Sequence, residues 1–235
     1  MPRRALTVAF IVGVLLWSRG QEARAAGRKA ALLQPMLEVL DKAKLSGSLE
    51  FSGRCELQDF PDFPQFRAAE TSGGSSPQAL REILADDAAM RVMQNPEGTI
   101  RMIESGVPTD LLNIRISHIS FENNENTGVY APNAALRFIL SAPEVVAFMK
   151  AHDIEWPFAI EGGSGIAGAW PPEFPHISGS LDDVTLSQAL DHVLKTFPGI
   201  WMYENCPRTD QKNRVVYFRF FFLRRLGSSV PFVDE

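Results

Sequence analysis

Hydrophobic and polar positions follow a helical period between residues 185 and 197. Apolar side chains recur there every third or fourth position, as on one buried helix face; they are Leu186, Ala189, Leu190, Val193, Leu194 and Phe197. Thr185 can cap the first turn, and Gln188 three residues later completes a capping box. Pro198-Gly199 ends the pattern. These positions predict a capped helix with one buried face.

Strand patterns surround this helix. Residues 200–206 and 214–223 are rich in aromatic and β-branched side chains and flank the polar turn "PRTDQKN", which predicts a hairpin. The second stretch is apolar on both faces, as in a central strand covered on both sides. If it were an edge strand, it would instead invite strand addition from a partner. A short extended segment, residues 175–183, is predicted before the helix.

The same order of elements occurs earlier in the chain. Residues 47–53 predict a strand, Ser76-Pro77 opens a helix, and residues 90–94 and 99–105 predict a hairpin. A shift of 110 positions overlays Gln78-Ala79-Leu80 on Gln188-Ala189-Leu190. An internal duplication would explain this order. Chance is the alternative, because an amphipathic helix followed by a hairpin is a common arrangement.

The segments around these units add helices and strands. In residues 110–123 a strand would place Leu112, Ile114, Ile116 and His118 on one face. A helical stretch, 131–153, breaks at Ser141-Ala-Pro143, where Ser141 can cap a second helix. The strand "WPFAIE" follows, and an N-terminal helix over 29–44 is expected to bend at Pro35.

The predicted fold is therefore α+β, with helices packed on short mixed or antiparallel sheets. We expect an N-terminal unit over residues 26–110, a C-terminal unit over 111–226 and a tail over 227–235.

The N-terminus has the form of a signal peptide over residues 1–25. Arg3 and Arg4 precede an apolar stretch over 5–17, and Ala23-Arg24-Ala25 supplies a small-x-small cleavage site. The apolar run is shorter than the roughly 20 residues of a membrane span. We expect a periplasmic or secreted protein without a membrane span after cleavage, and an uncleaved anchor is the alternative.

The net charge of the chain limits the classes of partner that we expect it to bind. The net charge of −5 becomes −8 without residues 1–25, which hold four Arg and one Glu. Such an acidic chain is poorly suited to the phosphate backbone, so no nucleic acid is expected as a partner.

Cys55 and Cys206 are the two cysteines of the chain. In an oxidising compartment an even pair indicates a disulfide. Two unpaired thiols are the alternative. A bridge would tie an early segment to a late one and would make detached domains unexpected.

Residues 142–223 resemble the STN-type module, the short N-terminal domain of secretins and some TonB-dependent receptors. The counterparts of its helix, strands and "TL..AL..LL" helix are "SAPEVVAFMKAHDIEWPFAIE", "PHISGSL", "VTLSQALDHVL" and the hairpin. The resemblance implies a periplasmic protein-contact module without catalysis. A Gly- and Pro-rich insertion, 161–175, departs from the pattern, and no secretin pore or receptor barrel follows in the sequence.

Catalytic chemistry lacks its usual markers. The spacing Gly163-x-Gly165-x-x-Gly168 is followed by "AWPPEFPH", whose prolines prevent the helix that a dinucleotide-binding turn requires. The sequence contains no HExxH, CxxC or GxSxG. His118, His152, His176 and His192 form no ligand or triad spacing. We therefore expect no catalytic residue, no metal and no cofactor, although a triad of distant residues stays possible.

The remaining sequence features favour a role in binding another protein. Residues 55–67 are rich in Phe and Pro. The candidate contacts with a partner protein are their aromatic side chains Phe60, Phe63 and Phe66, together with Trp170 of the insertion. The expected function is a non-catalytic interaction in the periplasm, with an envelope protein as partner.

Two alternatives stay open. The first is a hydrolase or small-ligand-binding protein with a pocket near residues 161–175, which convergence of His118, His176, Glu161 and Glu173 on one concavity would favour. The second is a structural envelope protein.

Overall fold

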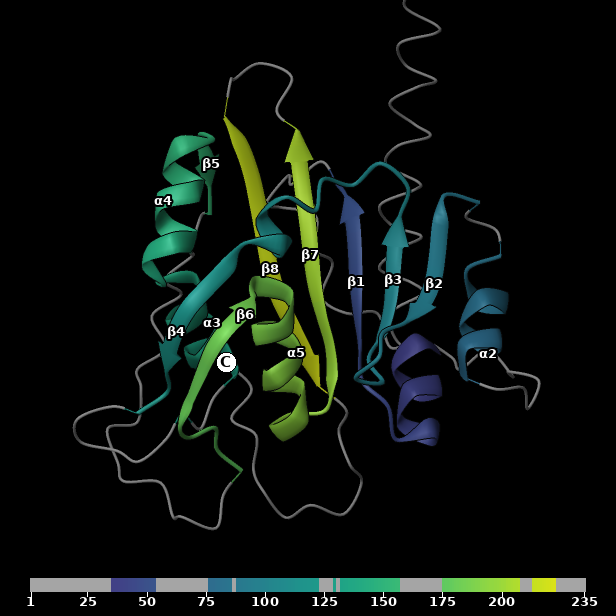
Figure 1. The fold of residues 1–235 in the computed structure, drawn as a ribbon. Helices are drawn as coiled ribbons and strands as arrows, with labels where there is room; N and C mark the ends of the chain where they lie inside the picture. The colour runs from purple at the N-terminus through teal and green to yellow at the C-terminus, as the bar shows by residue number, and fades with distance from the viewer. Residues whose placement is uncertain are drawn as a thin grey trace, which may run out of the picture.

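The protein has an α+β fold (Figure 1). The computed structural model describes residues 35–53, 76–85, 88–122, 129, 132–156, 175–207 and 213–222. The strands are β1 (Gly47–Ser52), β2 (Met90–Gln94), β3 (Ile100–Glu104), β4 (Arg115–Ser120), β5 (Ile154–Glu155), β6 (Ser180–Thr185), β7 (Gly199–Pro207) and β8 (Arg214–Phe222). The helices are an N-terminal helix (residues 35–43), α2 (Ser76–Ile83), α3 (Pro132–Leu140), α4 (Pro143–Ala151), α5 (Leu186–Thr196) and the 3₁₀ turn η1 (Leu111–Asn113).

A six-stranded mixed sheet organises the molecule, in the order β2-β3-β1-β7-β8-β5. β1 lies in its middle and runs parallel to both β3 and β7. The hairpins β2–β3 and β7–β8 are antiparallel, and β5 runs parallel to β8. β4 and β6 form a separate antiparallel ribbon. The two units expected from the sequence therefore share one sheet, joined by six residue pairs between β1 and β7.

Helices cover both faces of this sheet. Strand side chains alternate between the two faces, so each face carries its own set of apolar residues for helices to cover. Leu49 and Phe51 of β1 pack on one face with the N-terminal helix and α2. Trp201 and Tyr203 of β7 lie in a second core with α3, α4, α5 and the β4–β6 ribbon. β8 has buried side chains on both faces, as predicted for a covered strand, and β5 pairs with it only at Arg214 and Val215.

The two halves of the sheet have the same connectivity. In the first half the N-terminal helix, β1, α2 and the β2–β3 hairpin follow one another, and β1 runs parallel to β3. In the second half α4, β5, α5 and the β7–β8 hairpin occur in the same order, with β6 of the separate ribbon between β5 and α5, and β5 runs parallel to β8. The helices of the two halves cover opposite faces, and β2 runs opposite to its counterpart β7. A half-turn about an axis across the strands, combined with a shift along that axis, reverses both and relates one half to the other.

Helix α5 matches its sequence pattern closely. Its predicted apolar positions are all buried, and Thr185 and Gln188 form the expected reciprocal capping box. The side-chain oxygen of Thr185 accepts from the Gln188 N–H at 3.2 Å, and the Thr185 N–H donates to the Gln188 side chain at 2.8 Å. This helix is fixed against the sheet by one continuous apolar face.

Two local predictions are wrong. The N-cap of α4 is Ala142, which makes no side-chain capping bond, so Ser141 is not the cap. The predicted strand face with Leu112, Ile114, Ile116 and His118 also fails, because η1 breaks the alternation before β4 begins. Ile116 is buried, whereas the His118 side chain is 58% exposed.

Other expectations fall outside the described residues. They concern the signal peptide, the Gly163–Gly168 spacing, Cys55, Glu161, Glu173, most of the "WPFAIE" strand and the aromatic contact candidates Phe60, Phe63, Phe66 and Trp170.

Candidate functional site

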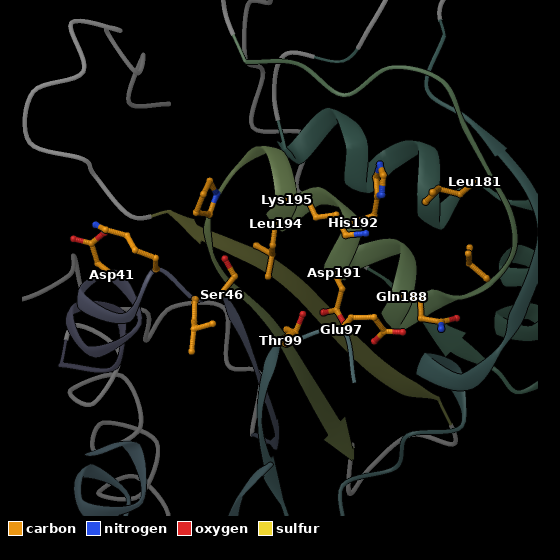
Figure 2. A pocket seen from close by; sticks show the side chains of 15 residues that line it. Asp41, Ser46, Glu97, Thr99, Leu181, Gln188, Asp191, His192, Leu194 and Lys195 are labelled. Atoms are coloured by element: carbon orange, nitrogen blue, oxygen red, sulfur yellow. The ribbon is translucent and has the colours of Figure 1, made fainter. Parts of the chain in front are cut away.

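A cleft of about 520 Å³ opens where the two halves of the sheet meet (Figure 2). We call it the junction cleft. Its described lining comes from the end of the N-terminal helix and the turn after it, from the β2–β3 turn, from β6 and from α5. Figure 2 shows Glu97, Gln188 and Asp191 gathered at one end of the cleft and Asp41 at the other. Polar groups from segments far apart in sequence therefore face one space.

Asp191 is the most deeply buried charged group in this lining, with 8% of its surface exposed. Its Oδ1 accepts from the Trp201 indole N–H at 2.7 Å, and its Oδ2 accepts from the Asn95 amide at 3.1 Å. Burial raises the pKa of Asp191 to about 6, although the Trp201 hydrogen bond and the Arg101 charge act in the opposite direction. A carboxyl of this kind changes charge near neutral pH.

Asn95 connects this carboxyl to the β2–β3 turn. Its side-chain oxygen accepts from the Thr99 N–H at 2.7 Å, and its amide group reaches Asp191 from the same side chain. Gly98 occupies the left-handed region of this turn with φ +90°, which suits a residue without a Cβ. The first hairpin is thus hydrogen-bonded to the helix of the second half.

A buried ion pair extends the network behind the cleft. Glu50 of β1 is fully buried, and its Oε1 accepts from Arg101 at 2.5 and 2.7 Å and from the Ser48 hydroxyl at 2.8 Å. The Arg101 guanidinium lies 5.7 Å from the Trp201 ring centroid, within range of a cation–π contact. Trp201 therefore contacts both Asp191 and Arg101. The second oxygen of Glu50 has no hydrogen-bond partner among the described residues.

His192 also lines the cleft and stacks on Phe121, with ring centroids 6.1 Å apart and planes 10° apart. Burial lowers its pKa, and the nearby Lys195 charge lowers it further. His192 is half-buried and lies at the boundary of the core.

The four sequence residues proposed to converge on an enzyme site are not seen together. His118 lies on β4 with its Nδ1 2.7 Å from an Asp182 carboxylate oxygen. His176 precedes the bridge between Ile177 and Val129, and it lines neither the junction cleft nor the cleft that contains His118. Glu161 and Glu173 lie outside the described residues. Cys206 is buried at the end of β7, and its predicted partner Cys55 is not described.

Within the described part of the chain, no group of three or more His, Cys, Asp or Glu side chains could hold a metal ion. None of the described helices is both long and apolar enough to cross a membrane. Comparisons with protein-family models, curated proteins and solved structures find no match to this chain.

Proposed function

We propose that the protein is an exported, non-catalytic interaction module that binds an extended segment of an envelope protein along β2. The signal-like N-terminus supports the compartment. The resemblance of residues 142–223 to STN-type modules supports a contact role. The single observation that carries the proposal is an open edge strand at the end of the main sheet.

β2 ends the sheet beside β3 (Figure 1), and no other described strand pairs with it. The Asn95 N–H donates to the Thr99 carbonyl at 3.0 Å, which fixes the alternation of the hairpin, so odd-numbered residues of β2 bond to β3. The even-numbered residues direct their N–H and C=O groups to the open side; they are Met90, Val92 and Gln94. A partner strand could bond to these groups by strand addition.

β2 carries one charged side chain, Arg91, and otherwise lacks the usual protection of an edge strand. Natural edges are often shielded by proline, by inward-pointing charge or by a bulge. β2 reads Met-Arg-Val-Met-Gln, and it pairs with β3 in one continuous register without a bulge. Met93 is 50% exposed beside this edge. An added strand could cover part of this apolar side chain while it bonds to the backbone.

Gln94 offers a test with a matched control. Gln94→Pro removes an N–H on the open side and leaves the bonds to β3 intact, whereas Gln94→Ala keeps that N–H. Both variants lose the side-chain hydrogen bond to the Gly98 carbonyl. The wild type and Gln94→Ala should retain the same envelope protein from extract in an affinity experiment, and Gln94→Pro should lose it.

Circular dichroism and urea unfolding must show that the proline variant is folded. Retention of the same partner by a folded Gln94→Pro variant would refute binding along β2. The alternative pocket near residues 161–175 lies outside the described part of the chain.

A further inference from the structure

The junction cleft exposes apolar side chains from the cores on both faces of the sheet. Leu45 packs on the core beside the N-terminal helix, and Leu181 and Val184 pack on the core beside α5. All three are half-buried, and they line the cleft. The cleft volume of about 520 Å³ is within the range of small-molecule sites. A ligand with an apolar body would remove more of this apolar surface from water.

A negative charge is available to a ligand at one end of this cleft. Glu97 lies in the β2–β3 turn, and it has no hydrogen bond or ion pair among the described residues. Figure 2 shows it beside Asp191. Burial raises the pKa of Asp191 most, and the charge of Glu97 raises it further, so the two carboxyl groups affect one another. Both Asp191 oxygens already accept hydrogen bonds, so Glu97 is the carboxylate that a ligand cation can bind without displacing an existing bond.

A positive charge is available in the same cleft. Lys195 follows Asp191 by four residues on α5, which places the two about 6 Å apart along the helix axis. An acidic residue and a lysine at this spacing often form an ion pair on a helix surface. Here the Asp191 oxygens bond to Trp201 and Asn95 instead, and Lys195 has no hydrogen bond or ion pair within the part of the chain that the structure describes.

The other charged groups of the described lining are less available. The Lys44 Nζ lies 3.5 Å from an Asp41 carboxylate oxygen, so these two charges offset each other. Burial and the charge of Lys195 lower the pKa of His192, which favours its neutral form. Glu97 and Lys195 do not pair with one another, since neither has an ion pair among the described residues. A ligand with a single charge would leave one of these two groups without a partner, whereas a ligand with both charges could bind both.

We propose that the junction cleft binds a zwitterionic α-amino acid with an aliphatic side chain, its ammonium group at Glu97 and its carboxylate at Lys195. Such a ligand carries both charges on one carbon atom, and the long side chains of Glu97 and Lys195 can reach it from two elements. Its aliphatic side chain would contact the half-buried apolar residues of the lining. Amino-acid binding needs no protein partner, so this proposal and strand addition at β2 can fail independently.

The test uses the purified full chain and L-leucine as the probe. Isoamylamine is leucine without its carboxylate, and isocaproate is leucine without its ammonium group, so each analogue keeps the aliphatic body and one charge. Titrations followed by backbone amide resonances should show leucine binding roughly tenfold or more tightly than either analogue. Resonances of α5 and of the β2–β3 turn should shift, and those of α4 should not.

Two variants assign each charge of the ligand to a residue. Glu97→Gln should weaken leucine and isoamylamine binding roughly tenfold and leave isocaproate binding unchanged, because it removes the charge-assisted bond to the ammonium group. Lys195→Gln should weaken leucine and isocaproate binding roughly tenfold and leave isoamylamine binding unchanged. Both residues are exposed, so both variants should fold, and urea unfolding checks this.

Matched controls remove the same charges from exposed positions outside the cleft. They are Glu122→Gln, after β4, and Lys150→Gln, on α4. Neither control should change leucine binding. Leucine binding no tighter than that of both analogues, or equal losses in the cleft variants and their controls, would overturn the proposal.

Discussion

At the scale of single residues, the junction depends on buried polar groups that satisfy one another. Asp191, Arg101 and Glu50 lie around Trp201. The Trp201 indole N–H donates a hydrogen bond to Asp191, and its ring contacts the Arg101 guanidinium. Burying such charges is unfavourable unless each has a partner, so removing one member leaves the others exposed to that cost. We expect this cluster to control how the junction responds to pH.

Asp191→Asn tests that response. Burial raises the pKa of Asp191 from 3.8 to about 6, so between these values the folded state holds more protons than the unfolded state. The contribution of this carboxyl to stability therefore falls as pH rises through this window, by up to about 3 kcal/mol. As the pH rises from 4 to 7, the stability of Asp191→Asn relative to wild type should increase by up to about 3 kcal/mol, as measured by urea unfolding.

Asp183→Asn is a control of opposite sign. The hydrogen bond and charge of Arg115 lower the pKa of Asp183, so this carboxylate stabilises the fold more as pH rises. Asp183→Asn should therefore be less stable than wild type by an amount that stays nearly constant from pH 4 to 7 and shrinks as the pH falls below 4. A stability difference between Asp191→Asn and wild type that stays constant from pH 4 to 7 would show that Asp191 titrates normally.

At the scale of elements, the capped helix α5 links the core to the junction. Its N-terminus is fixed by the Thr185–Gln188 capping box, and its buried face carries Asp191 into the cleft. The cap therefore contributes to positioning the cleft as well as to helix stability.

Thr185→Ala should lower the free energy of unfolding by about 1 kcal/mol, because it removes the acceptor for the Gln188 N–H. Thr185→Ser keeps the hydroxyl and should lose much less. Urea unfolding at one pH measures both variants. If the serine variant lost as much as the alanine variant, the methyl group of Thr185 rather than its cap would account for the effect.

The elements with strong periodicity could be predicted from the sequence. α5 and its C-cap Phe197 have six apolar positions on one face, and the β7–β8 hairpin has two apolar strands around a polar turn, so local patterns were sufficient. The order of the strands could not be predicted, because β1 pairs with β3 and with β7, about 50 and 150 residues further along the chain. No local pattern specifies such pairings.

The junction cleft could not be predicted from the sequence either, because it also depends on the pairing of strands that lie far apart in the chain. In β1, Ser48 and Glu50 alternate with Leu49 and Phe51, as in a strand with one solvated face. The structure buries that polar face, because β1 pairs with β7, whose Trp201 lies beside Ser48 in register. In the sequence, only its place between the apolar positions Leu190 and Val193 weakly indicates that the acidic residue Asp191 is buried. His118 was misplaced because the 3₁₀ turn η1 interrupts the alternation from which its face was read.

At the scale of the whole molecule, two halves with equal connectivity are joined by parallel strands. We infer an internal duplication, because in both halves the first strand runs parallel to the second strand of the hairpin. The β1–β7 pairing and the hydrogen bond from Asn95 to Asp191 hold the halves together. A unit boundary near residue 110 therefore separates two parts of one sheet.

The predicted disulfide would strengthen this joint. Cys206 is buried next to Asn205, whose carbonyl accepts from the Gly53 N–H at 2.9 Å. Cys55 follows Gly53 by two residues, which span at most about 7 Å of chain. Disulfide Cα atoms lie about 4.4–6.8 Å apart, so the length of chain between Gly53 and Cys55 permits the predicted bridge.

Reduction of this bridge should destabilise the protein strongly. The closed loop holds about 150 residues, and the chain-entropy model assigns such a crosslink roughly 4–5 kcal/mol as an upper value. Urea unfolding with and without dithiothreitol should show a loss of several kcal/mol in wild type. Cys55→Ser should already have the lower stability and should not respond to the reductant. That control separates loss of the bridge from other effects of dithiothreitol. Two thiols reactive in unfolded, unreduced protein would exclude the crosslink, and the β1–β7 strands and the Asn95–Asp191 bond would then have to hold the halves together without it.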